Sequence, residues 1–124
     1  MTFKNMILSA ATILALSVIG APLAAQDEEA VSQEEQVDNG LKNFGYIAGL
    51  SRGCVAEHQQ MAFERDVMEM NSAITRLLGV DRAFLFSAAF GYGTSVEVER
   101  ENCAEILRQY ESRSANFRNA AQGG

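Results

Sequence analysis

Four residues near the centre of the sequence are the clearest candidates for chemistry. His58 is the only histidine, and Met61, Arg65 and Met68 follow it at helical spacing, which places the set on one helix face. Imidazole and thioether groups together can bind Cu(I), a soft metal ion. Methionine also fills cores and lines recognition surfaces. The pattern favours a second core face, and it leaves open a partner-binding site at Met61, Arg65 and Met68 or a copper site at His58, Met61 and Met68.

Catalysis by the histidine has little support. A catalytic His needs a nucleophile, an orienting carboxylate or further metal ligands. Glu57 is adjacent in sequence, but neighbouring residues do not face each other on a helix. The known motifs of serine hydrolases, metalloproteases and phosphate-binding loops do not occur. We therefore expect an exposed surface imidazole, no enzyme activity and no cofactor.

The two cysteines, Cys54 and Cys103, are far apart and form no C-x-x-C motif. In an oxidising compartment such a pair favours a structural disulfide, with a bridge between molecules as the alternative. The loop-entropy model assigns a bridge of this span about 4 kcal/mol of stability.

The chain of 124 residues begins with a segment typical of an exported protein. Lys4 precedes an uncharged apolar stretch, and Gly20, Pro22 and small residues follow it. This pattern predicts a signal peptide over 1–25 and a periplasmic or secreted destination. A membrane anchor is the alternative, but the apolar stretch is short and interrupted.

Residues 26–38 contain six acidic and no basic residues, and we expect a solvated, flexible tail. The net charge of −6 is concentrated there, since residues 39–124 hold ten acidic and nine basic residues. Without a basic surplus, nucleic acid is not an expected partner.

Hydrophobic periodicity over 39–118 predicts four helices. The first begins near Asp38 or Asn39, with an apolar stripe formed by Leu41, Phe44, Ala48, Ser51 and Val55. Gly45, Gly49 and Gly53 recur every four residues on another face. Such a repeat indicates either close packing of a neighbouring helix or a break near Gly53.

The second helix is expected over 57–78, with Gly79 ending it and an apolar face of Phe63, Val67, Met70, Ile74, Leu77 and Leu78. A third helix over 82–90, capped by Asp81, is expected to be the most buried, with a short strand as the alternative.

The region 91–97 is predicted to separate the last two helices. Residues 91–93 read Gly-Tyr-Gly, which suggests a turn, and 94–97 match a helix-capping box. The fourth helix then continues to Arg118, and residues 119–124 are expected to fray.

Together these elements predict an all-α, four-helix bundle-like domain closed by one disulfide. The plan of a short exported helical chain with two distant cysteines is similar to that of HdeA-type periplasmic acid chaperones. We expect a non-catalytic periplasmic module that binds another envelope protein and does not stay inserted in a membrane. A stress-responsive holdase and a copper binder are the alternatives.

Overall fold

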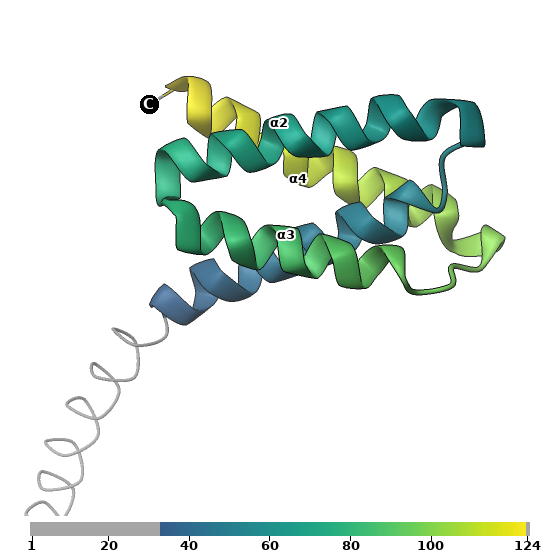
Figure 1. The fold of residues 1–124 in the computed structure, drawn as a ribbon, viewed down its shortest axis with the longest axis horizontal. Coiled ribbons are helices and arrows are strands. Elements are labelled where there is room, and N and C mark those ends of the chain that lie inside the picture. The colour runs from purple at the N-terminus through teal and green to yellow at the C-terminus, as the bar shows by residue number, and fades with distance from the viewer. Residues whose placement is uncertain (1–32, 124) are drawn as a thin grey trace, which may run out of the picture. The chain divides into compact units, whose positions relative to one another are not determined.

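The computed structural model describes residues 33–123, and the predicted signal peptide (1–25) and most of the acidic tail lie outside them. Residues Val37–Gly124 form one compact unit. Over the described residues the chain forms four α-helices and no strand. They are the helix over 33–52, here called the leading helix, then α2 (Gln60–Leu78), α3 (Val80–Thr94) and α4 (Cys103–Gly123) (Figure 1). Short 3₁₀ turns, η1 (Glu57–Gln59) and η2 (Arg100–Asn102), precede α2 and α4. The all-helical prediction is confirmed.

The leading helix packs its apolar stripe against both α3 and α4. Leu41, Phe44, Ile47 and Ala48 are buried, as their spacing predicted. The ring of Phe44 lies 5.1 Å from that of Phe86 on α3, and 6.0 Å from that of Tyr110 on α4. This helix already includes residues 33–37, ahead of the start expected at Asp38 or Asn39, and those five residues are exposed.

Two glycines of the leading helix lie directly against α3. A Cβ atom on Gly45 would collide with the carbonyl of Phe86, and one on Gly49 with the carbonyl of Phe90 and the backbone of Gly93. We call Gly45, Gly49 and Gly93 the glycine seam. Gly53 lies instead in the turn that ends the helix. Close packing of a neighbouring helix is therefore confirmed at Gly45 and Gly49, and the break in the helix is confirmed at Gly53.

Helix α2 forms one hairpin with α3, and Gly79 is the only residue between them. Gly79 has a φ of 99°, a conformation that favours glycine, as predicted for this helix end. Val67, Met70 and Ile74 are buried. Leu77 and Leu78, expected on the apolar face, are 51% and 37% exposed, so their prediction as core was wrong. They belong to the last turn of α2, immediately before the chain reverses.

Helix α3 is longer than predicted and differs in its burial. Gly91, Tyr92 and Gly93 are helical rather than a turn, because the seam buries Gly93 against the leading helix. Asp81 lies in the first turn rather than at the cap. Only Ala83, Phe86 and Gly93 are buried, so the expectation that this is the most buried element was wrong.

The expected capping box after α3 does not start a helix. Thr94 is the last residue of α3, and its hydroxyl donates a 2.7 Å hydrogen bond back to the carbonyl of Gly91. Helix α4 begins only at Cys103 and continues to Gly123, past the predicted end at Arg118. The fraying expected of residues 119–124 concerns motion of this helix end and stays a prediction.

The disulfide joins the turn after the leading helix to the first residue of α4. Cys54 and Cys103 are bonded, with their Cα atoms 5.3 Å apart. The intramolecular bridge is confirmed, and it places Cys103 at the first residue of α4. Among the described helices, none is long and apolar enough to cross a membrane.

Candidate functional site

The predicted stripe on α2 lies in solvent. Met61 is 74% exposed and Met68 is 70% exposed, and Arg65 is exposed as well. His58 is also exposed, but it lies in η1 rather than on the helix expected over 57–78, because α2 begins only at Gln60. The favoured second core face is therefore wrong, while the exposure expected for His58 is found. Met61 and Met68 lie two helical turns apart, roughly 10 Å along the axis, with Arg65 between them on the same face. The geometry thus leaves the partner-binding hypothesis as the simplest for Met61, Arg65 and Met68.

A second exposed apolar surface lies on α3 and was not predicted. Val80 is 71% exposed, Phe84 70% and Tyr92 66%, while Phe86 on the inner side of the same helix is fully buried. Ala88 and Gly91 continue the exposed strip. We call Val80, Phe84, Ala88, Gly91 and Tyr92 the outer face of α3. Val80, Phe84, Ala88 and Tyr92 follow one another at intervals of four residues, which places neighbouring members on the same side of the helix, with the exposed Asp81 beside them near the helix start.

The apolar composition of α3 is the sequence feature that corresponds to this surface. Apolar residues surround the whole circumference of α3, with Phe84, Leu85 and Phe86 in succession. That distribution on its own predicts complete burial. In a bundle of four helices, however, each helix contacts neighbours on part of its circumference, and the rest of α3 remains in water.

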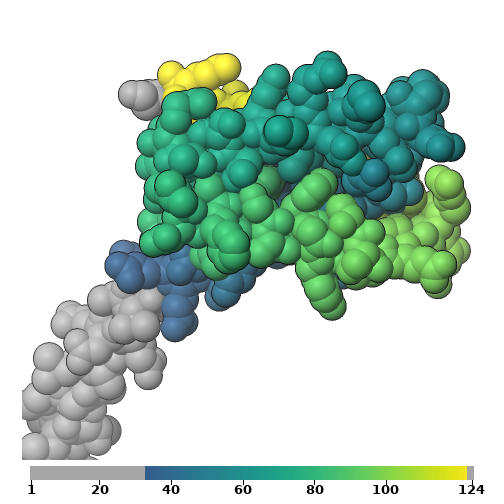
Figure 2. Space-filling view, viewed as in Figure 1, coloured from purple at the N-terminus to yellow at the C-terminus, as the bar shows by residue number. Residues whose placement is uncertain are grey.

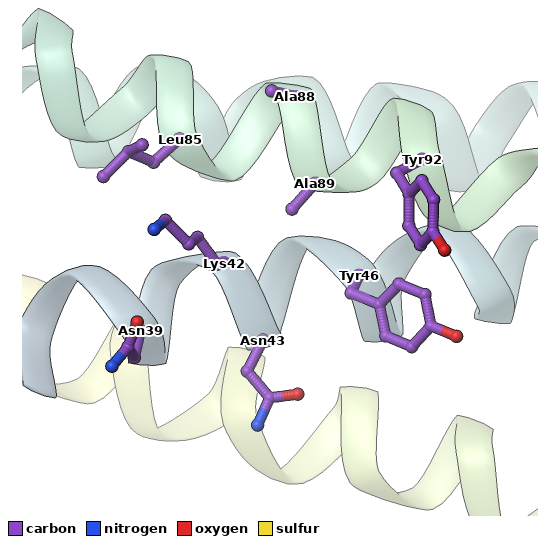
Figure 3. Close-up of a pocket in the computed structure, with 8 residues that line it drawn as sticks. All are labelled: Asn39, Lys42, Asn43, Tyr46, Leu85, Ala88, Ala89 and Tyr92. Carbon is purple, nitrogen blue, oxygen red and sulfur yellow. The ribbon is translucent and has the colours of Figure 1, made fainter.

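A shallow groove follows the line where the leading helix meets α3 (Figure 3). Its volume is about 630 Å³. Leu85, Ala88 and Ala89 form its apolar side, and the rings of Tyr46 and Tyr92 lie 5.7 Å apart at one end. Lys42 extends between the two helices toward Leu85 (Figure 3). No ion pair joins Lys42 to a carboxylate of the described chain, so the groove carries one cation beside an aromatic pair.

A smaller and more enclosed cleft lies between α2 and α3, which run side by side across the face shown in Figure 2. It measures about 200 Å³. Its walls are the apolar residues Val67, Phe86 and Phe90 and the polar residues Asn71 and Ser87, with Glu64 and Met68 completing the lining. The side-chain oxygen of Asn71 is buried and has no hydrogen-bond partner. In this cleft, a residue with a buried, unpartnered polar atom lines a mainly apolar cavity.

The charged side chains mainly tie helices together. Asp66 on α2 accepts hydrogen bonds from the hydroxyl of Tyr110, at 2.6 Å, and from the guanidinium of Arg118, both on α4. Burial, and then the hydrogen bond to Asp66, raise the pKa of Tyr110 well above its usual value. Arg52 pairs with Glu64 in the same way near the disulfide end.

On the surface of α4, the pKa of Glu105 is lowered to about 2 by the hydrogen bonds that it accepts from Arg108 and Gln109. Glu105 and Arg108 are both solvent-exposed, so this pair has no burial that would mark it as a reactive site. Within the described residues, no three His, Cys, Asp or Glu side chains are grouped closely enough to hold a metal ion.

Comparisons with models of protein families, with curated proteins and with solved structures found no match for this chain.

Proposed function

We propose that this protein is a non-catalytic interaction module that binds another protein through the outer face of α3. The observation that carries the proposal is the exposure of Val80, Phe84 and Tyr92 on a helix whose inner side supplies the fully buried Phe86. Contiguous apolar patches on a protein surface are typical of sites where another molecule docks. Aromatic side chains at the centre of such patches contribute a large share of binding energy.

The outer face of α3 is a better docking surface than the stripe on α2. Asp81 is the one charged residue among the exposed residues of α3 between Val80 and Tyr92, and it lies near the helix start. The two large aromatic side chains, Phe84 and Tyr92, have few rotatable bonds to restrict on binding. On α2, Arg65 separates Met61 from Met68 and would have to be desolvated in an interface. The groove beside Tyr92 adds Lys42 as a polar margin, as is common around an apolar interface.

The proposed location is the periplasm or the extracellular space. Support comes from the bond between Cys54 and Cys103, because structural disulfides persist in oxidising compartments. The signal-like pattern of residues 1–25 supports the same location. The partner would then be another protein of the cell envelope or its surroundings.

Site-specific photo-cross-linking in the producing cells tests the proposal. A photoreactive residue at position 88 lies on the outer face of α3, and one at position 65 lies on the α2 stripe. We expect position 88 to yield a product of discrete mass, and Phe84→Ser to reduce its yield by about ten-fold or more. Met68→Ser is the matched control, since Met68 is as exposed as Phe84, and it should leave the yield unchanged.

Two results would contradict the proposal. One is the absence of any discrete product from position 88 while the protein is folded and oxidised. The other is a product from position 65 that Met68→Ser abolishes and Phe84→Ser does not. Both substitutions replace exposed side chains, so thermal unfolding should verify that stability changes by no more than about 0.5 kcal/mol.

A further inference from the structure

We propose that the cleft between α2 and α3 is a binding site for a small monocyclic aromatic compound that carries a hydrogen-bond donor, such as a phenol. This site is separate from the outer face of α3, since none of the residues of that face lines it. The proposal follows from three properties of the cleft: its size, its aromatic walls and an amide group without a partner.

The size of the cleft suits a single six-membered ring. Its volume is about 200 Å³, and an apolar cavity of roughly 150 Å³ in a protein is enough to hold benzene. A bicyclic or larger ligand would extend past Glu64 and Met68 into solvent. The dimensions therefore select compounds of about seven to nine heavy atoms.

The walls of the cleft favour an aromatic ligand. Phe90 is partly buried and lines the cavity, where a pair of rings gains more than the buried area alone provides. The fully buried Phe86 borders the same cavity and keeps that wall apolar. Met68, whose side chain is 70% exposed, also borders the cavity. A flexible thioether there can fold over a bound ring and make a sulfur–aromatic contact.

The polar requirement comes from Asn71. Its side-chain oxygen is buried without a hydrogen bond, a state that costs free energy in the unliganded protein. This amide makes no side-chain hydrogen bond within the described chain, so a change of side-chain rotamer that brings the amide to the cavity breaks no hydrogen bond. Ser87 of α3 also lines the cleft, and its hydroxyl makes no side-chain hydrogen bond within residues 33–123. A ligand hydroxyl or N–H would supply the missing donor.

A matched pair of probes separates the apolar contribution from the polar one. p-Cresol and toluene differ only by one hydroxyl group, and both can be titrated into the folded, oxidised protein while amide shifts are followed by NMR. We expect both to bind weakly, with Kd on the order of 1 mM. The perturbed amides should be those of α2 and α3 around Asn71, Phe86 and Phe90.

Variants of the cleft then identify the group that recognises the hydroxyl. Asn71→Leu keeps a similar size and removes the acceptor, so p-cresol should bind about ten-fold more weakly while toluene binding changes less than about two-fold. Ser87→Leu adds bulk to the wall and should block both probes. Ser72→Leu, on the exposed residue next to Asn71, is the control and should change neither affinity.

The variants should fold, because Asn71→Leu removes an unsatisfied buried polar atom, and thermal unfolding checks this directly. The proposal is overturned if neither probe binds the wild-type chain at millimolar concentration. It is also overturned if Asn71→Leu weakens the two probes equally, or if the shift changes locate to the Tyr46–Tyr92 groove instead. None of these results depends on whether the outer face of α3 binds a protein.

Discussion

Replacing Gly49 by alanine should destabilise the protein, although alanine is the better helix former. Gly49 lies inside the leading helix, where the exchange of Gly for Ala alone would stabilise by about 1 kcal/mol. The added Cβ atom, however, would meet the carbonyl of Phe90 and the backbone of Gly93. These are main-chain atoms of α3, so no side-chain rotation can relieve the contact.

The size of the effect follows from these two opposing contributions. Overpacking in a close contact costs about 1–3 kcal/mol of stability. A contact between the added Cβ atom and main-chain atoms of α3 belongs at the upper end of that range, because the main chain cannot move aside easily. After the gain in helix propensity is subtracted, Gly49→Ala should lower the free energy of unfolding by about 1–2 kcal/mol. Gly40 lies in the same helix, and a Cβ atom added there would have no neighbour within 4 Å. Gly40→Ala should therefore raise the free energy of unfolding by up to about 1 kcal/mol.

Urea unfolding of the oxidised chain, followed by far-ultraviolet circular dichroism, measures both variants against the wild type. The two substitutions are chemically identical and occur in one helix, so the opposite signs isolate the contact with α3. If Gly49→Ala and Gly40→Ala shifted the midpoint in the same direction by similar amounts, the glycine seam would not be a close helix contact.

Three further changes have expected outcomes. Replacing Cys54 and Cys103 by serine together should lower the free energy of unfolding by about 4 kcal/mol in urea titrations, since it opens a loop with a separation of 49 residues; an unchanged midpoint would contradict this. The raised pKa of Tyr110 means that the folded protein holds the phenolic proton more tightly than the unfolded chain, so stability should fall as the pH rises above about 10. Urea midpoints between pH 8 and pH 11 would show this slope, and Tyr110→Phe should remove it. Gly79→Ala should cost about 1–3 kcal/mol in the same assay because the residue has φ 99° and ψ 166°, whereas Gly91→Ala, in open helical space, should not destabilise.

The parts of the fold that local pattern determines were predictable. The spacing of Leu41, Phe44 and Ala48 identified the buried side of the leading helix, and Gly79 identified the end of α2. These features depend on periodicity and on backbone conformation, which a short window of sequence contains. The pairing of Cys54 with Cys103 was also predictable, because they are the only two cysteines.

The errors occurred where a tertiary contact outweighs local preference. The Gly-Tyr-Gly sequence at 91–93 has the composition of a turn, yet it stays helical because Gly93 is held against Gly49, which is more than 40 residues away in sequence. Nothing in the local sequence marks that partner. Residues 95–99 are also not helical despite their capping pattern, and α4 begins at Cys103, the residue bonded to Cys54.

The candidate surfaces were harder to predict because they depend on which side of each helix the bundle covers. Periodicity identified the α2 stripe as distinct from the core side of α2, but it could not decide whether a second layer covers Met61 and Met68. On α3, apolar residues occur around most of the helix, so periodicity could not separate a buried side from an exposed side. The orphaned oxygen of Asn71 has no sequence signal, since its neighbours in the cleft come from both α2 and α3.

The glycine seam and the outer face of α3 both follow from the way α3 packs against the leading helix. The contact with the leading helix uses Gly45, Gly49 and Gly93, so that side of α3 accommodates backbone rather than large side chains. The bulky residues Val80 and Phe84 therefore lie on the side away from the seam, in water. The fold gains nothing from apolar groups at these exposed positions, since polar helix formers would serve equally well there. The docking partner proposed above would account for them, because it would cover large apolar side chains that the bundle itself leaves exposed.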